Sequence, residues 1–545
     1  MANDATVFEF PDPEPGRSER FRALAFQVVD EALAGEQRLP WAKTTYLVFV
    51  ALLGLALLAA PPTIFNPYSP YFLFVIGAIG FWRYGWGALH VARALIYRKL
   101  VFPRWRRALR DLPDGGRPSE IFLLVTSFRI DAEIARLVFG SVVAEAIHFN
   151  RKTTIVASIV ESGDERLVRA VFECFDPPPH IRLCIVRIAG KGKRAGLGYG
   201  FRAISGMLPA KDAVVCVIDG DTLLERGLLE KTLPFFKLRA NVAALTTDEI
   251  CDVRGSMLYR EWYNLRFAQR QIYMCSVGLS RRVLTLTGRM SAFRADIVTD
   301  PSFIAQVEND AIDHWRFGVI PFLTGDDKSS WYWILQRGYE MMYVPDARIR
   351  TVEDPPDKNF LIGSTALMRR WFGNMLRTNS RAISLGPKPM GLYTWWCIVD
   401  QRITMWTTLI GPFSVILIAL FYNSSFLYLY LLWVGCSRLL QTTMLFTVRD
   451  TVSGFYPILL FFNQVYGACI KTYVSFRLNR QTWTRQKTTL KSERSRWGQT
   501  MEIYSNRFVH GVALLFLGTA VASLIGLLQT PNVGAFEEMF GSLLW

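Results

Sequence analysis

The chain has 545 residues, 51% of them hydrophobic and 14% aromatic, and a formal net charge of +16. The length would suit two to four soluble domains, but a mean hydropathy of +0.19 argues against an ordinary soluble protein. Eight cysteines and five histidines show no metal-ligand spacing, which disfavours a zinc site. We assign most of the basic excess to membrane topology and the rest to an anionic ligand, and we expect no nucleic-acid partner.

The N-terminal part predicts a tail followed by a membrane anchor. Residues 1–44 are polar and contain prolines, which indicates a cytoplasmic N-terminal tail. Apolar stretches at 46–63 and 70–92 approach the roughly 20 residues of a membrane span, so we expect two transmembrane helices within 45–97. By the positive-inside rule the following stretch is cytoplasmic, because it carries a cluster of basic residues: Arg98, Lys99, Arg104, Arg106, Arg107 and Arg110.

The mixed segment 98–390 predicts a large cytoplasmic α/β domain. Strand-like runs at 120–128, 152–161, 181–188 and 213–219 alternate with helical periodicity, which indicates parallel strands joined by right-handed crossovers. Ligands of such open sheets bind beyond the carboxyl ends of the strands. Several candidate site residues fall at these ends: Thr126, Ser127, Phe128, Glu161, Gly192, Lys193, Asp219 and Asp221.

The run "AVVCVIDGDTLL", residues 213–224, ends an apolar strand on two acids with one glycine between them. Two carboxylates at this spacing can project to one side of a turn, and Mg²⁺ commonly takes one or two carboxylates plus substrate phosphates. We predict that Asp219 and Asp221 bind Mg²⁺ or Mn²⁺. The structural alternative is a simple turn, which explains most DxD sequences.

Two later motifs also carry candidate chemistry. Asp326 and Asp327 in "FLTGDDKSSW" are adjacent, so mutual repulsion could raise one pKa and favour a general base; a helix N-cap is the alternative. In "LMRRWFGN", Arg370 offers a fork for phosphate and Trp371 a flat face for a sugar ring. An amphipathic interfacial helix would explain the same residues.

A glycine-rich stretch, "GKGKRAGLGYGFR", could cradle a diphosphate through Lys193 and Arg194. It is not a Walker A sequence, and no GxGxxG opens a helix after the first strand. A dinucleotide cofactor is therefore disfavoured.

Apolar stretches return at 403–421, 425–447 and 508–529, which predicts a C-terminal transmembrane region over 391–545. The stretch 455–474 is also apolar. A full crossing there would place the following cluster of basic residues outside the cytoplasm, so we expect this stretch to bend back or lie in the interface.

Arg83 and Arg438 interrupt apolar stretches of the expected membrane region. Ionisable groups at membrane depth usually face a bundle interior or a water-filled cavity. Both residues are candidates for lining an exit path, with helix pairing or snorkelling as the alternative.

The order DGD, GDD and RRW between apolar helices resembles the processive family 2 glycosyltransferases over about residues 70–530. Stretches such as "RIAGKGKRAGLGYGFRAIS", "TLTGRMSAFRA" and "FLTGDDKSSW" are similar to the branch of bacterial mannuronan synthases that polymerise alginate. The resemblance implies a cytoplasmic α/β GT-A domain with interfacial helices at 98–390, inserted in an α-helical bundle of the bacterial inner membrane.

The resemblance also implies roles for matching residues. Asp219 and Asp221 would hold the metal against the donor diphosphate, and Asp327 would be the general base, with Asp326 as its substitute. The other implied roles are donor binding by Thr126, Ser127, Phe128, Glu161, Lys193 and Arg370, and acceptor binding by Trp371, Arg289 and Arg294. Two positions depart from the family pattern, because Leu367 stands where QxxRW begins and Glu161 where an aspartate is expected.

The implied activity is inverting polymerisation of mannuronate from GDP-mannuronate, with passage of the growing polysaccharide across the membrane. A synthase that uses a UDP-sugar and a non-catalytic scaffold subunit remain the alternatives. The basic loop 477–507 contains "NRQTWTRQKTT", where related synthases carry a gating loop; a flexible linker is the alternative. No RxxxR…[DN]xSxxG pattern occurs, so the resemblance implies a separate cyclic-di-GMP-binding PilZ-type copolymerase and an envelope secretion complex.

Overall fold

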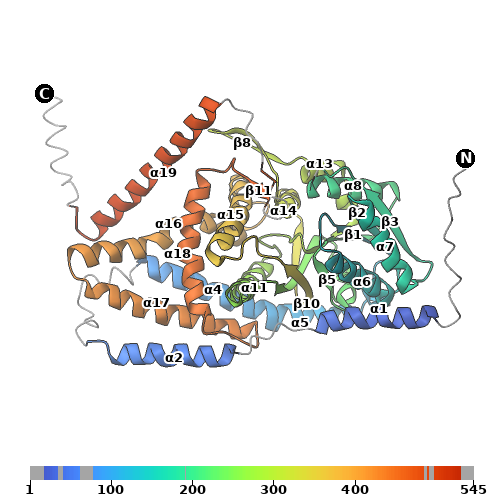
Figure 1. Ribbon diagram of the computed structural model, residues 1–545, viewed down its shortest axis with the longest axis horizontal. Coiled ribbons are helices and arrows are strands. Elements are labelled where there is room, and N and C mark those ends of the chain that lie inside the picture. Colours follow the sequence, from blue (N-terminus) through green and yellow to red (C-terminus); the bar gives the residue numbers. More distant parts are fainter. Residues whose placement is uncertain are drawn as a thin grey trace, which may run out of the picture.

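The computed structural model describes residues 17–34, 41–61, 78–190, 192–483, 488–489 and 496–528. Figure 1 shows a part built around a sheet beside a group of long helices. The strands are β1 Glu120–Thr126, β2 Lys152–Ile159, β3 Ile181–Arg187, β4 Val214–Asp219, β5 Thr222–Leu224, β6 Val242–Val253, β7 Met290–Arg294, β8 Ala311–His314, β9 Gly318–Pro321, β10 Glu340–Glu353, β11 Thr482–Trp483 and β12 Thr488–Thr489.

The helices that accompany the sheet are α1 Arg17–Ala34, α5 Phe102–Arg110, α6 Ala132–Phe149, α7 Ser162–Phe175, α8 Lys193–Gly206, α9 Leu228–Thr232, α10 Phe235–Leu238, α11 Met257–Gly278, α12 Ala295–Val298, α13 Pro301–Glu308, α14 Asp326–Gln336 and α15 Phe360–Ser384. The remaining long helices are α2 Ala42–Leu58, α4 Ala78–Ile96, α16 Leu392–Phe421, α17 Ser425–Thr443, α18 Tyr456–Ser475 and α19 Arg496–Leu524.

Eight strands form one mixed sheet in the order β3-β2-β1-β4-β7-β6-β10-β5. The first four run parallel, as the sequence predicts, whereas β7 is antiparallel to both β4 and β6. The middle of β1, residues 121–125, has no exposed surface because helices cover both faces of the sheet. The expected α/β architecture is therefore confirmed.

Helix α1 lies within the stretch 1–44 that the sequence analysis describes as an N-terminal tail. It packs against α6 and α7, where the ring of Phe26 meets that of Phe175 at 4.9 Å and Val29 is buried. The Arg350 guanidinium also donates to the carbonyl of Leu33. The acidic tip of the chain lies outside the described residues.

Among the described residues, two helices are long and apolar enough to cross a membrane, within Leu392–Phe421 and Trp497–Leu524. Each of the other predicted spans corresponds at least in part to a helix: α2, α4 and α17, with the start of 70–92 outside the described residues. The stretch 455–474 forms α18, which contacts α11, α15, α16 and α17.

Large apolar side chains are exposed on several of these helices. Leu58 of α2, Leu420 of α16, Leu440 of α17 and Phe516 of α19 are between 60% and 86% exposed. Exposed apolar surface on neighbouring helices marks an interaction with lipid or protein.

Candidate active site

The two acids of the DGD motif lie where β4 ends beside β1. Asp219 is paired in register with Thr126, and the amide of Gly220 donates to the Thr126 carbonyl at 2.9 Å. A Cβ at position 220 would lie 2.9 Å from that oxygen and 3.0 Å from the Cα of Ser127. Only a glycine lets the chain turn this close to β1, so the motif's middle residue positions both acids.

Lys193 joins the DGD and GDD motifs. Its Nζ lies 2.6 Å from Asp219 Oδ1 and 2.9 Å from Asp326 Oδ2, although β4 and α14 are more than a hundred residues apart in sequence. A Cβ on Gly288 would come within 2.8 Å of this Nζ, so the glycine of the "TGR" stretch leaves room for the lysine. The structure thus brings three sequence-predicted motifs to one point.

The charges around Lys193 separate the pKa values of the two GDD acids. Burial opposes ionisation of Asp326, but Lys193 and Arg194 together hold its pKa below the ordinary value. Burial and the charge of Asp326 raise the pKa of Asp327. A carboxylate kept ionised beside one with a raised pKa is an arrangement that suits proton transfer by the second group.

Arg194 has a different place from the expected diphosphate cradle. Its guanidinium is buried and donates to the carbonyls of Val307 at 2.7 Å and Thr324 at 3.1 Å. These bonds hold the turn before α14. The turn is also tied to α15, because the Thr324 hydroxyl lies 2.8 Å from Asn374 Oδ1.

Trp371 lies one turn before Asn374 on α15 and forms an aromatic platform with α11. Its ring stacks on Trp262 at 5.6 Å, and the Arg266 guanidinium lies 4.1 Å above its centroid. The half-buried Arg370 precedes it on the same helix. Stacked indoles beside a cation suit the apolar face and the polar groups of a sugar.

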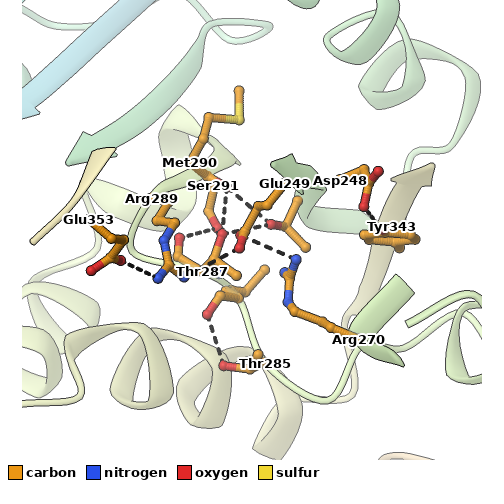
Figure 2. A network of polar contacts seen from close by, with 12 residues as sticks. Asp248, Glu249, Arg270, Thr285, Thr287, Arg289, Met290, Ser291, Tyr343 and Glu353 are labelled. Carbon is orange, nitrogen blue, oxygen red and sulfur yellow. Dashed lines mark hydrogen bonds and ion pairs between the residues drawn. The ribbon is translucent and has the colours of Figure 1, made fainter. Parts of the chain in front are cut away.

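Figure 2 shows a network of ion pairs around Glu249. Glu249 has no exposed surface and pairs with Arg270 at 3.2 Å and Arg289 at 3.3 Å, and Arg289 also pairs with Glu353 at 2.6 Å. The Arg289 carbonyl accepts the amide of Asp219 at 3.1 Å. Arg289 therefore supports Asp219 through its backbone, while its side chain is held by acids.

One predicted site residue, Arg294, lies apart from this group. Arg294 pairs in register with Val214 at the opposite end of β4, and its guanidinium donates to the carbonyls of Val242, Phe236 and Arg239. We therefore withdraw it from the acceptor residues. Glu161 follows β2 at the same edge as Thr126 but is exposed.

The start of the expected gating loop reaches the site. Gln481 accepts the amide of Leu323 at 3.1 Å and donates to Pro321 at 2.7 Å. A Cβ on Gly192 would lie 3.9 Å from the Trp483 ring. The segment before the GDD turn is thus covered by residues that follow α18.

The two arginines of the apolar helices point between helices. Arg83 of α4 pairs with Asp400 of α16 at 2.6 Å, and Arg438 of α17 donates to the Tyr84 hydroxyl at 3.0 Å. Nε and Nη2 of Arg83 and Nε of Arg438 are buried without a hydrogen-bond partner among the described residues. These contacts are the helix pairing given above as the alternative to an exit path, although each guanidinium retains unused donors.

A family model described as "Glycosyltransferase like family 2" matches residues 118–374, which include the α/β sheet and the acids at its carboxyl edge, and it identifies a sugar-transfer enzyme of the GT-A type. The chain belongs to the family 2 glycosyltransferases. Glycosyltransferase alg8 of Pseudomonas syringae pv. tomato is 50% identical over 463 residues, covering 85% of this chain and 94% of that protein. Glycosyltransferase alg8 of Azotobacter vinelandii is 46% identical over 478 residues, covering 88% and 96%.

A solved structure, the mannosyltransferase PcManGT from Pyrobaculum calidifontis in complex with GDP-Man and Mn²⁺, has a TM-score of 0.43 and 16% identity to this chain. The structural match covers 71% of this chain and 98% of the mannosyltransferase chain.

The sequence pattern did not reveal the bridging position of Lys193 or the stacking of Trp262 and Arg266 against Trp371. Lys193 was visible as part of a glycine-rich stretch, but its two partners are distant in sequence. Trp262 and Arg266 are spaced by four residues on α11, which marks one helix face but not what that face meets.

Proposed function

We propose that this chain is a membrane-embedded, processive, inverting glycosyltransferase that polymerises mannuronate from GDP-mannuronate and passes the polymannuronate across the bacterial inner membrane. The observation that carries the proposal is the meeting of Asp219 and Asp326 on Lys193, next to Asp327. The similarity to two alg8 glycosyltransferases over most of the chain supports the alginate-type product.

The carboxylates at this edge suit a divalent cation, because Asp219 and Asp326 already bind one positive charge and Asp221 follows Asp219 by two residues. Asp219 and Asp221 would hold Mg²⁺ or Mn²⁺, which would neutralise charge on the departing diphosphate. The described residues contain no cluster of three or more ligating His, Cys, Asp or Glu side chains. The remaining ligands would therefore be diphosphate oxygens and water.

Asp327 would accept the proton of the acceptor hydroxyl, with Trp371 holding the acceptor sugar. Thr126, Ser127, Phe128 and Glu161 would contact the nucleoside at the ends of β1 and β2. Arg370 and Lys193 would bind the diphosphate. When the donor enters, its phosphates would replace Asp326 as a partner of Lys193.

The apolar helices would form the exit path, with Arg83 and Arg438 facing a polymer that carries one carboxylate per sugar. The exposed apolar side chains of α2, α16, α17 and α19 support a multi-pass arrangement in the inner membrane. A PilZ-type copolymerase that binds cyclic-di-GMP and an envelope secretion complex would be its partners. The segment around Trp483 would act as a gate over the donor.

Donor specificity tests the proposal. Membranes containing the full chain, with and without the copolymerase, are incubated with labelled GDP-mannuronate or a panel of UDP-sugars. We expect polymer from the GDP donor only. Polymer from a UDP-sugar would replace the proposed donor, and no transfer from any donor with the copolymerase present would favour a non-catalytic scaffold.

A further inference from the structure

A basic pocket lies against the helical segment that follows α4. Helix α4 continues through a π-turn, Tyr97–Val101, into α5. Between its face and Pro345–Asp346 of β10 lies a pocket of about 420 Å³. The pocket is lined by four arginines: Arg98, Arg106, Arg107 and Arg110.

The pocket carries more positive charge than its own acid balances. Arg106 binds Asp346 through two hydrogen bonds of 2.8 and 2.5 Å, and the Arg98 guanidinium donates to the Thr447 carbonyl. Arg107 and Arg110 are exposed and make no hydrogen bond or ion pair with any described residue. Four guanidiniums against one carboxylate leave a charge of +3.

Apolar side chains close in sequence to the pocket's first arginine are exposed. Ile96 and Leu100, each two residues from Arg98, are 42% and 52% exposed, and Phe446, next to the Thr447 that Arg98 binds, is 47% exposed. A ligand that combined an anionic head with an apolar tail would match both parts. A soluble phosphate would use only the arginines.

We propose that this pocket binds the phosphate headgroup of an anionic phospholipid, whose acyl chains lie against Ile96, Leu100 and Phe446. The inference rests on the membrane placement in the proposed function. Basic clusters on the cytoplasmic side of a membrane helix attract anionic lipids, at roughly fivefold in affinity for each basic residue.

The test uses the purified full chain in detergent micelles, titrated with fluorescent phosphatidylglycerol or phosphatidylcholine. One double variant, Arg107→Gln with Arg110→Gln, removes the two unpaired pocket arginines. The matched control, Lys99→Gln with Arg104→Gln, removes the same charge from exposed positions of the same helix that do not line the pocket. Thermal unfolding of each variant verifies that it is folded.

We expect wild type and control to prefer phosphatidylglycerol, and the pocket variant to bind it about 10-fold or more weakly. Equal losses of phosphatidylglycerol affinity in both variants would show diffuse attraction to the basic surface and rule out the pocket as the binding site. Full competition by inorganic phosphate, with no added affinity from the lipid, would overturn the lipid assignment. A chain that stays soluble without detergent would instead refute the membrane placement and the proposed function with it.

Discussion

At the residue scale, Asp327 is the side chain on which the proposed chemistry depends. Replacing it by Asn keeps the size of the side chain but removes the base, so we expect polymer synthesis to fall by at least about 100-fold. Donor binding, measured by nucleotide protection from thermal unfolding, should be retained. Asp313→Asn, at an exposed position of β8, is the control. Near-normal synthesis by the Asp327 variant would remove the base assignment.

The raised pKa of Asp327 sets the direction of the pH dependence. A base works only when deprotonated, so activity should fall as pH decreases through a pKa above the ordinary aspartate value. Asp326→Asn removes the neighbouring negative charge, which lowers the pKa of Asp327. The acidic limb of the pH–rate profile should therefore move to lower pH in this variant. An unmoved limb would show that another group titrates.

The acids at the strand ends could be predicted because an apolar run followed by carboxylates is visible in a short stretch of sequence. The roles of the basic side chains could not. Lys193 and Arg194 are neighbours in one glycine-rich stretch and Arg289 follows a single glycine. Yet Lys193 bridges two acids, Arg194 holds a turn and Arg289 pairs with Glu249 and Glu353. Their partners come from other elements, which sequence spacing does not show.

At the scale of elements, the ion network holds β6, β7, β10 and α11 together behind the site. Glu249→Gln leaves Arg270 without its charge partner and weakens the hold on Arg289. Breaking a buried pair in this way costs about 3–5 kcal/mol, so we expect a clear fall in the unfolding free energy. Thermal and denaturant unfolding of the full chain measure it.

The comparison for this prediction is Glu165→Gln, which breaks the exposed pair with Arg169 on α7. An exposed pair one helical turn apart contributes only about 0.3–0.5 kcal/mol. If the two variants unfold alike, the network does not stabilise the sheet.

The parallel strands β1 to β4 were predictable because their Val- and Ile-rich runs alternate with helical patterns. The antiparallel position of β7 between β4 and β6 was not predictable, since the composition of a strand does not reveal its direction. Helix α1 was included in the predicted tail because residues 1–44 are polar and contain prolines. Its first residues are charged, and its apolar positions make sense only against α6 and α7.

At the scale of the whole molecule, Arg438 tests the exit path. Arg438→Gln removes a positive charge between α17 and α4 while keeping a hydrogen-bond donor for Tyr84. If the charge favours the anionic chain by about 1 kcal/mol, secreted polymer should fall by roughly fivefold. Gel filtration of secreted and retained polymer measures length and amount. Arg136→Gln, exposed on α6, is the control, and polymer unchanged in length and secretion would argue against this path.

Arg449, which follows α17, has a consequence for how the proposed synthase would move its product. Arg449 lies between α17 and α18, and its guanidinium binds Asp248 of β6 at 2.9 Å and also Gln271 of α11. These contacts connect the sheet and the helices through two buried side chains, Asp248 and Gln271. Forward steps of the polymer would then arise from local shifts of a loop or a side chain, because a swinging motion of the catalytic half would have to break this joint on every cycle.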